Sequence, residues 1–160
     1  MTINIVTVGK LKEKYWRDAC DEYIKRLSAF GKASITELSE ARLPDEPSAA
    51  EIKAALTKES EEMRKFSKIK NAANVALCIE GDMLSSVQLS DRLKQFAVSG
   101  RSTVNFFVGS SFGIDEDFKK ECDLRLSMSR MTFPHQLARV MLAEQIYRAF
   151  SIGANSKYHK

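Results

Sequence analysis

Short apolar runs alternate with longer amphipathic segments along almost the whole chain. Runs rich in β-branched and apolar residues, bounded by glycine or polar residues, are typical of strands. The predicted strands comprise residues 2–8, 33–38, 74–79, 102–108 and 124–129. Apolar residues at helical spacing predict helices at residues 13–27, 48–66, 86–98, 115–121 and 136–150. This alternation predicts an α/β fold with a mainly parallel sheet flanked by helices, in one domain spanning residues 1–160.

Local sequence signals predict where two of these helices begin and which strands lie at the centre of the sheet. Ser48 with Glu51 three residues later fits a capping box, and Pro134 stands just before the last helix, where its missing N–H costs nothing. The strands at 74–79 and 102–108 are continuously apolar, which is typical of strands buried on both faces. We expect them to lie inside the sheet.

The last predicted helix is unusual because apolar residues occupy nearly its whole circumference. A helix that is apolar on all sides has to be buried on all sides, which a chain of 160 residues can hardly arrange alone. We therefore expect a second subunit to supply the missing cover, as in a homodimer. The residues concerned are Leu137, Val140, Met141, Leu142, Ile146, Tyr147 and Phe150.

Composition narrows the class of protein. There is no run of apolar residues long enough for a membrane span, and the N-terminal segment places its lysines after its apolar stretch, the reverse of a secretory signal. We expect a cytoplasmic protein. The three cysteines, Cys20, Cys78 and Cys122, are widely spaced and form no CxxC pair, so we expect reduced thiols, with neither a disulfide nor a metal site.

The net charge of +4 is unevenly distributed. Up to Ser129 the basic and acidic residues balance at 20 each. The whole excess follows, and both histidines, His135 and His159, lie in the same stretch. A localised basic excess favours a polyanionic partner such as nucleic acid, although charge alone is equally compatible with a solvated basic end.

Ligands of open parallel sheets bind beyond the carboxyl ends of strands. Three such ends are conspicuous, after Ile79, Val108 and Ser129. The loop at 109–113 is rich in small residues, which suit either close approach of a ligand to the backbone or a simple tight turn. The turn at 127–136 offers backbone groups that could bind an adenine or a ribose; alternatively, it is a helix entry anchored in the core by Met131 and Phe133.

The C-terminal quarter also holds candidates for contact with nucleic acid. Arg148 follows Glu144 by four residues, a favourable local pair, whereas Arg139 has no local partner and is the better functional candidate. The chain ends in Tyr158, His159 and Lys160. An aromatic ring, an imidazole and a cation can together stack on a base and contact phosphate, although termini are more often inert.

Several segments resemble one known family. The stretch MTFPHQ, the helix ending EQIYRAF, the terminal YHK and the opening VTVGKLKEKYW are together similar to the ribosomal RNA large subunit methyltransferase H family, over essentially the whole chain. The resemblance implies a SPOUT-type α/β fold with a deep C-terminal trefoil knot. It implies transfer of a methyl group from S-adenosylmethionine to N3 of a pseudouridine in a hairpin loop of 23S ribosomal RNA. It also implies a homodimer in which each cofactor site lies near the partner subunit.

The family's pattern implies roles for individual residues. The cofactor-binding positions fall on Leu77, Gly109, Met128, Ser129, Arg130, Met131, Thr132 and Phe133. On the catalytic side, His159 is a candidate general base, Arg139 would steer the RNA, and Tyr158 would stack on it. The positions expected to contact RNA are Arg139, Arg148, Tyr158, His159 and Lys160.

The chain departs from the family pattern at Ser110 and Asn155, where glycines are usual. Asparagine tolerates positive φ, so the change at Asn155 is mild. Ser110 could narrow the cofactor loop, which would change the affinity for the cofactor and not the function. Two other functions stay open: a non-catalytic ribosome-binding module of the same fold, and a methyltransferase that acts on another RNA.

Overall fold

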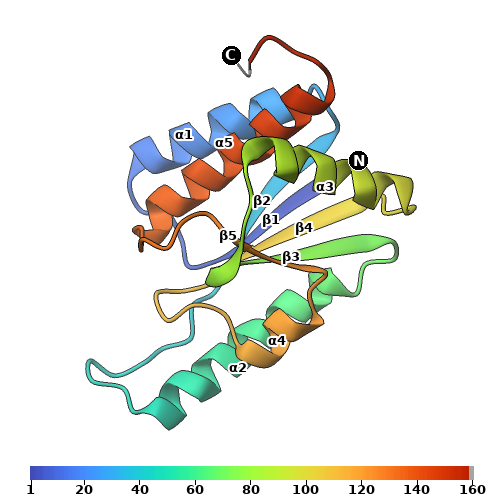
Figure 1. The fold of residues 1–160 in the computed structure, drawn as a ribbon. Helices are drawn as coiled ribbons and strands as arrows, with labels where there is room; N and C mark the ends of the chain where they lie inside the picture. Colours follow the sequence, from blue (N-terminus) through green and yellow to red (C-terminus); the bar gives the residue numbers. More distant parts are fainter. Residues whose placement is uncertain (159–160) are drawn as a thin grey trace.

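A computed structural model describes residues 1–158 of the chain. Five parallel strands form one sheet in the order β2-β1-β4-β3-β5, and five helices cover it (Figure 1). The strands are β1 (Thr2–Val8), β2 (Lys32–Leu38), β3 (Ala72–Met83), β4 (Thr103–Val108) and β5 (Leu124–Ser127). The helices are α1 (Lys14–Leu27), α2 (Ala49–Ser67), α3 (Ser86–Val98), α4 (Glu116–Glu121) and α5 (His135–Gly153). The predicted α/β architecture is confirmed.

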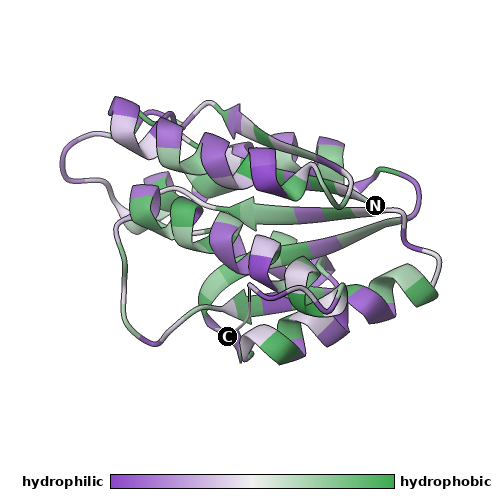
Figure 2. Ribbon diagram, turned by 90° about the horizontal axis from the view of Figure 1, so that it is seen from above, coloured by the Kyte–Doolittle hydropathy of each residue, from purple (hydrophilic) through white to green (hydrophobic). Residues whose placement is uncertain are grey.

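The helices divide between the two faces of the sheet. Helices α1, α3 and α5 lie on one face, and α2 and α4 lie on the other (Figure 1). Alternate residues of β1 serve the two layers: Ile3 and Ile5 pack in the core beneath α1, α3 and α5, whereas Val6 and Val8 pack with Met63 of α2. Apolar positions accordingly dominate the strands, whereas apolar and polar positions alternate along the helices (Figure 2). Strand β4 is buried along its whole length, as its continuous apolar run predicts.

A row of polar side chains crosses this otherwise apolar sheet. The Asn4 amide donates to Asn105 Oδ1 at 2.9 Å, and the Asn105 amide donates to Asn74 Oδ1 at 2.9 Å. These three residues are also direct partners in the strand register. Because a slip of one residue would leave buried amides unpaired, the row fixes the alignment of β1, β4 and β3.

The structure corrects the bounds at the β3 and β5 edge. Strand β3 continues beyond Ile79 to Met83, with a register shift between Leu77 and Asp82 against β5. A Cβ at Gly81 would lie 2.7 Å from the backbone of Arg125, so this glycine permits a close approach of two strands and does not end one. Strand β5 ends at Ser127, two residues earlier than predicted, because the chain turns there.

Helix boundaries follow the local signals closely. The Ser48 hydroxyl accepts the Glu51 N–H and the Glu51 side chain accepts the Ser48 N–H, so the predicted capping box begins α2. Helix α5 has Pro134 as its N-cap residue and runs three residues beyond the predicted end. Within residues 1–158, no helix combines the length and the apolar character that crossing a membrane requires.

The packing around α5 partly corrects the expectation that a second subunit has to cover its apolar faces. Helices α1 and α3 of the same chain flank it, and Leu142, Ala143 and Ile146 are fully buried there. Val140 and Met141 remain half-buried. One chain therefore supplies much of the cover that the apolar pattern had assigned to a second subunit.

Candidate functional site

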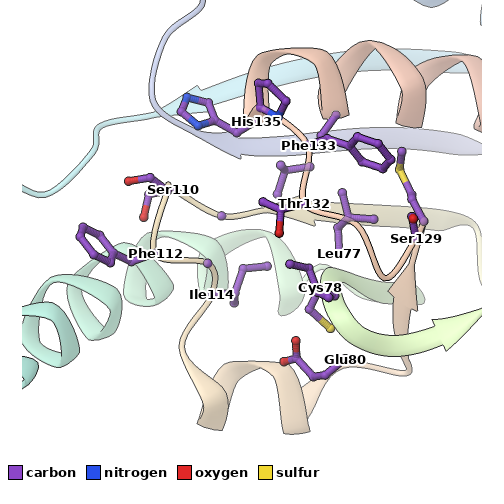
Figure 3. A pocket seen from close by; sticks show the side chains of 18 of the residues that line it. Leu77, Cys78, Glu80, Ser110, Phe112, Ile114, Ser129, Thr132, Phe133 and His135 are labelled. Carbon is purple, nitrogen blue, oxygen red and sulfur yellow. The ribbon is translucent and has the colours of Figure 1, made fainter.

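The three predicted strand ends meet at one cavity. It has a volume of about 710 Å³ and lies between residues 77–80 of β3, the loop after β4 and the segment between β5 and α5 (Figure 3). A volume of this size is typical of sites for small molecules and cofactors. Seven of the eight residues expected to bind the cofactor line it: Leu77, Gly109, Met128, Ser129, Met131, Thr132 and Phe133. Arg130 is exposed and does not line the cavity.

The loop at 109–113 is both a tight turn and a wall of the cavity. The Gly113 N–H donates to the Ser110 carbonyl at 2.9 Å, which closes the turn. A Cβ at Gly109 would lie 2.1 Å from the Gly113 carbonyl oxygen, so only glycine fits there without movement. The tight turn is therefore confirmed, and the loop also lines a cavity, whereas a ligand role for the loop stays a prediction.

The segment at 128–134 forms the opposite wall. The Ser127 hydroxyl donates to the Ser129 carbonyl at 3.0 Å, and the Ser129 hydroxyl accepts the Met131 N–H at 3.0 Å. Met131 is 71% exposed, so the alternative in which it anchors the core is wrong. Phe133 is half-buried and faces the cavity, as Figure 3 shows.

An ion pair that the sequence analysis did not predict stands at one side of the cavity. Lys119 of α4 is buried and pairs with Glu80, just past the buried part of β3, and with Glu116 at 2.7 Å. The hydrogen bond from Lys119 holds the pKa of the Glu80 carboxyl below its usual range. At neutral pH the cavity wall therefore carries the negative Glu80 carboxylate and the positive Lys119 ammonium, whose charges largely cancel. The i,i+3 spacing of Glu116 and Lys119 could have indicated their pairing, but not their place at the cavity.

Cys78 also lines the cavity, next to Leu77. Burial, together with the nearby Glu80 carboxylate, raises the pKa of its thiol to about 11. The thiol is therefore protonated at neutral pH and is a poor nucleophile. Among residues 1–158, no cluster of three or more His, Cys, Asp or Glu side chains is placed to hold a metal ion.

Arg139 does not occupy the position that the sequence predicted. Its side chain is fully buried and donates to the carbonyl oxygens of Val8 at 2.6 Å and Gly9 at 3.0 Å. It also pairs with Glu37 at 3.2 Å. The expectation that Arg139 steers RNA, and acts on the catalytic side, is wrong because all of these partners lie inside the chain and solvent does not reach the guanidinium.

Arg148 and Tyr158 lie together on the outer side of α5. Arg148 Nε donates to Glu144 Oε1 at 2.9 Å, which confirms the expected local pair. The Arg148 guanidinium lies 4.7 Å from the centroid of the Tyr158 ring, and the Tyr158 hydroxyl donates to Glu144 Oε1 at 3.2 Å. The last described residue is thus folded back on the helix. His159 and Lys160 lie outside the described residues.

This cluster is remote from the cavity of its own chain. His135 lines the cavity at the first turn of α5, and Glu144 follows nine residues later, about 13 Å along the helix axis. Within one chain, the structure therefore does not bring Tyr158 to the residues expected to bind the cofactor.

Comparisons with known proteins assign the fold and the family. A family model described as a predicted SPOUT methyltransferase matches residues 1–159. The chain is 47% identical to "Ribosomal RNA large subunit methyltransferase H" of Bifidobacterium animalis subsp. lactis, over the full length of both proteins. It is 46% identical to the protein of the same name from Bacillus pumilus, again over the full length of both. This chain belongs to the ribosomal RNA large subunit methyltransferase H family of SPOUT methyltransferases. The resemblance found in the sequence is confirmed.

More distant solved structures share the fold. A probable methylase family protein from Haemophilus influenzae has a TM-score of 0.54 and 11% sequence identity, with 99% of this chain and 70% of the other covered. A probable methyltransferase from Bordetella pertussis has a TM-score of 0.53 and 12% identity, with 92% of this chain and 95% of the other covered. At such low sequence identity these similarities concern the architecture alone. It is membership of the family that makes the chain a methyltransferase.

Proposed function

We propose that this chain methylates N3 of a pseudouridine in a hairpin loop of 23S ribosomal RNA, with S-adenosylmethionine as the methyl donor. The observation that carries the proposal is the meeting of three strand ends at one cavity, lined by seven of the residues that the family pattern implies. The names of full-length relatives at 47% and 46% identity support ribosomal RNA as the substrate class. Such a substrate also supports a cytoplasmic location.

The cavity residues fit the donor. A Cβ at Gly109 would collide with the Gly113 carbonyl, so glycine lets the loop close tightly and keep its shape as a cavity wall. Leu77, Met128 and Phe133 give apolar walls, and Ser129 and Thr132 bring hydroxyl groups to the same cavity. When bound, S-adenosylmethionine supplies a sulfonium methyl group for transfer to a nucleophilic nitrogen. The chain's own task is to hold the cofactor in place and to exclude water from it.

We further propose that the functional unit is a homodimer. The Tyr158 cluster is remote from the cavity of its own chain, so a tail that meets the cofactor would have to come from the partner. The half-buried Val140 and Met141 on α5 offer apolar surface for that contact. We also expect the deep trefoil knot that the family resemblance implies near the C-terminus.

The tail would then perform the RNA chemistry at the partner's cavity. Transfer to N3 requires removal of the N3 proton, for which His159 is the candidate base. Tyr158 would stack on a base, and Arg148 and Lys160 would contact phosphate. Arg148 is already held beside the Tyr158 ring, so both can act as one preformed contact surface. Arg139 has no part in this scheme because it is buried.

Calorimetric titration with S-adenosylmethionine tests the cofactor site. We expect saturable binding by the wild-type protein and a loss of at least about tenfold in affinity for Gly109→Ala, because the added Cβ would lie 2.1 Å from the Gly113 carbonyl oxygen. Gly153→Ala, the same change at the end of α5 and away from the cavity, is the matched control; its added Cβ would lie 3.4 Å from the nearest side chains, and it should bind as the wild type does. Absence of binding by the wild type at millimolar ligand would reject the enzymatic function in favour of a non-catalytic ribosome-binding module.

A further inference from the structure

One buried carboxylate stands directly behind the proposed cofactor loop. Glu59 belongs to α2, whose neighbouring residues Glu61 and Glu62 are exposed, yet Glu59 is only 4% exposed. Among residues 1–158 it forms no ion pair. Burial raises the pKa of its carboxyl, partly offset by the hydrogen bonds that it accepts. Burying an unpaired carboxylate is costly, so a position like this calls for an explanation.

Its two oxygens join two separate loops. Glu59 Oε1 accepts the backbone N–H of Ala41 at 3.0 Å, in the segment between β2 and α2. Glu59 Oε2 accepts the hydroxyl of Ser110 at 3.0 Å, in the loop after β4. The carboxylate therefore bridges segments that lie 18 residues before it and 51 residues after it.

Ser110 is a wall residue of the cavity and controls the shape of the loop. Its carbonyl accepts the Gly113 N–H at 2.9 Å, and Gly109 beside it has no room for a side chain. The loop is thus fastened across its own turn by one bond and to α2 by another. A glycine at this position, usual in the family pattern, would leave Glu59 Oε2 without this donor.

We propose that Glu59 is a positioning residue, which holds the loop at 109–113 in its cofactor-binding shape through the hydroxyl of Ser110. The proposal rests on the proposed function, because it takes the cavity to be the S-adenosylmethionine site. Glu59 itself does not line that cavity. It borders a second cavity, of about 760 Å³, between α2 and the segment at 39–44, so displacement of Ala41 would reach the cofactor loop through the same carboxylate.

A double-mutant cycle tests this role. The affinity for S-adenosylmethionine is measured by calorimetry for the wild type, Glu59→Ala, Ser110→Ala and the double variant. Each single change should weaken binding about tenfold. The affinity of the double variant should be no lower than that of the single variant with the lower affinity, because both changes break one shared link. The KM for S-adenosylmethionine should rise in parallel, with kcat retained.

Two further variants separate positioning from a general structural effect. Glu59→Gln should bind within about twofold of the wild type, because its carbonyl can accept the Ala41 N–H and its amide can donate to the Ser110 oxygen. Glu62→Ala is the matched control and should bind as the wild type does: Glu62 lies on the same helix and borders the same second cavity, but its carboxylate pairs with Lys65.

Losses that multiply in the double variant would overturn the proposal, since the two residues would then act independently. If Glu59→Ala fails to fold, the affinity of Ser110→Ala for S-adenosylmethionine still tests the proposal, because this change removes only a hydroxyl. Unchanged affinity in Ser110→Ala would contradict the proposal. Absence of binding by the wild type would reject the proposed function together with this inference, whereas independent losses reject the inference alone.

Discussion

The guanidinium of Arg139 donates a hydrogen bond of 2.6 Å to the carbonyl oxygen of Val8, which lies 131 residues earlier in the chain. This bond, the one to Gly9 and the pair with Glu37 join the second turn of the last helix to the ends of β1 and β2. Ala138, the preceding residue, lines the cavity. The buried guanidinium of Arg139 thus fixes the position of the N-terminal part of α5 beside the proposed cofactor site.

Replacement of Arg139 by methionine should cost stability. The change keeps most of the buried volume but removes the donor of two carbonyl oxygens and the cation that pairs with Glu37, whose carboxylate keeps only the Leu11 N–H. Breaking a buried pair in this way costs about 3–5 kcal/mol. Urea denaturation followed by circular dichroism measures it. Arg148→Met is the matched control on the same helix; since its pair with Glu144 is local and partly exposed, we expect a loss of less than about 1 kcal/mol. Equal losses in both variants would contradict the structural role of Arg139.

The thiol of Cys78 should report on occupancy of the cavity. Because burial raises its pKa to about 11, alkylation by iodoacetamide should be slow at pH 7.5 and accelerate roughly tenfold per pH unit towards that value. Saturating S-adenosylmethionine should protect Cys78, which lines the cavity, but leave the slow reaction of Cys122 unchanged. Peptide mass spectrometry distinguishes the two sites. Equal protection of both cysteines would indicate a general tightening of the fold and not a ligand beside Cys78.

Deletion of Tyr158, His159 and Lys160 should abolish methylation while cofactor binding and the fold persist. The contacts of Tyr158 with Glu144 and Arg148 are on the outer side of α5, remote from the cavity. Methylation of ribosomal RNA, calorimetry with S-adenosylmethionine and thermal denaturation measure the three properties. Full activity of the truncated chain would reject a catalytic role for the tail.

Mixed dimers test whether one subunit's tail serves the other's cavity. At S-adenosylmethionine concentrations well below the dissociation constant of Gly109→Ala, tail-deleted chains should be inactive and Gly109→Ala chains nearly so. Co-refolding them in equal amounts should restore about a quarter of wild-type activity, because half of the dimers then contain one complete site. No recovery, although mixed dimers are shown to form, would mean that each tail serves its own chain.

The sequence predicted the architecture well because its signals are local. The Ser48 and Glu51 capping box and the continuous apolar run of β4 concern neighbouring residues, and periodicity detects both. The cavity followed from them, since parallel strands present their carboxyl ends at one edge. Seven cofactor positions then came from the family pattern.

The errors concern partners that are distant in the chain. Arg139 lacked a local partner and so suggested a free cation, whereas its acceptors lie 102 and 131 residues away. The strand predicted to end at Ile79 continues to Met83, because no local pattern reveals that Gly81 permits a close approach to β5. The link between Glu59 and Ser110 spans 51 residues and was equally invisible.

Methylation of ribosomal particles from a strain that lacks this enzyme tests the central claim most directly. Free 23S ribosomal RNA, large subunits and whole ribosomes are each incubated with the protein and S-adenosylmethionine, and the RNA is digested for nucleoside and fragment mass spectrometry. We predict one added methyl group, on N3 of a pseudouridine in a hairpin loop, with at least one of the three substrates. A protein that binds S-adenosylmethionine but methylates none of them, or that modifies a different nucleotide, would contradict the proposed function.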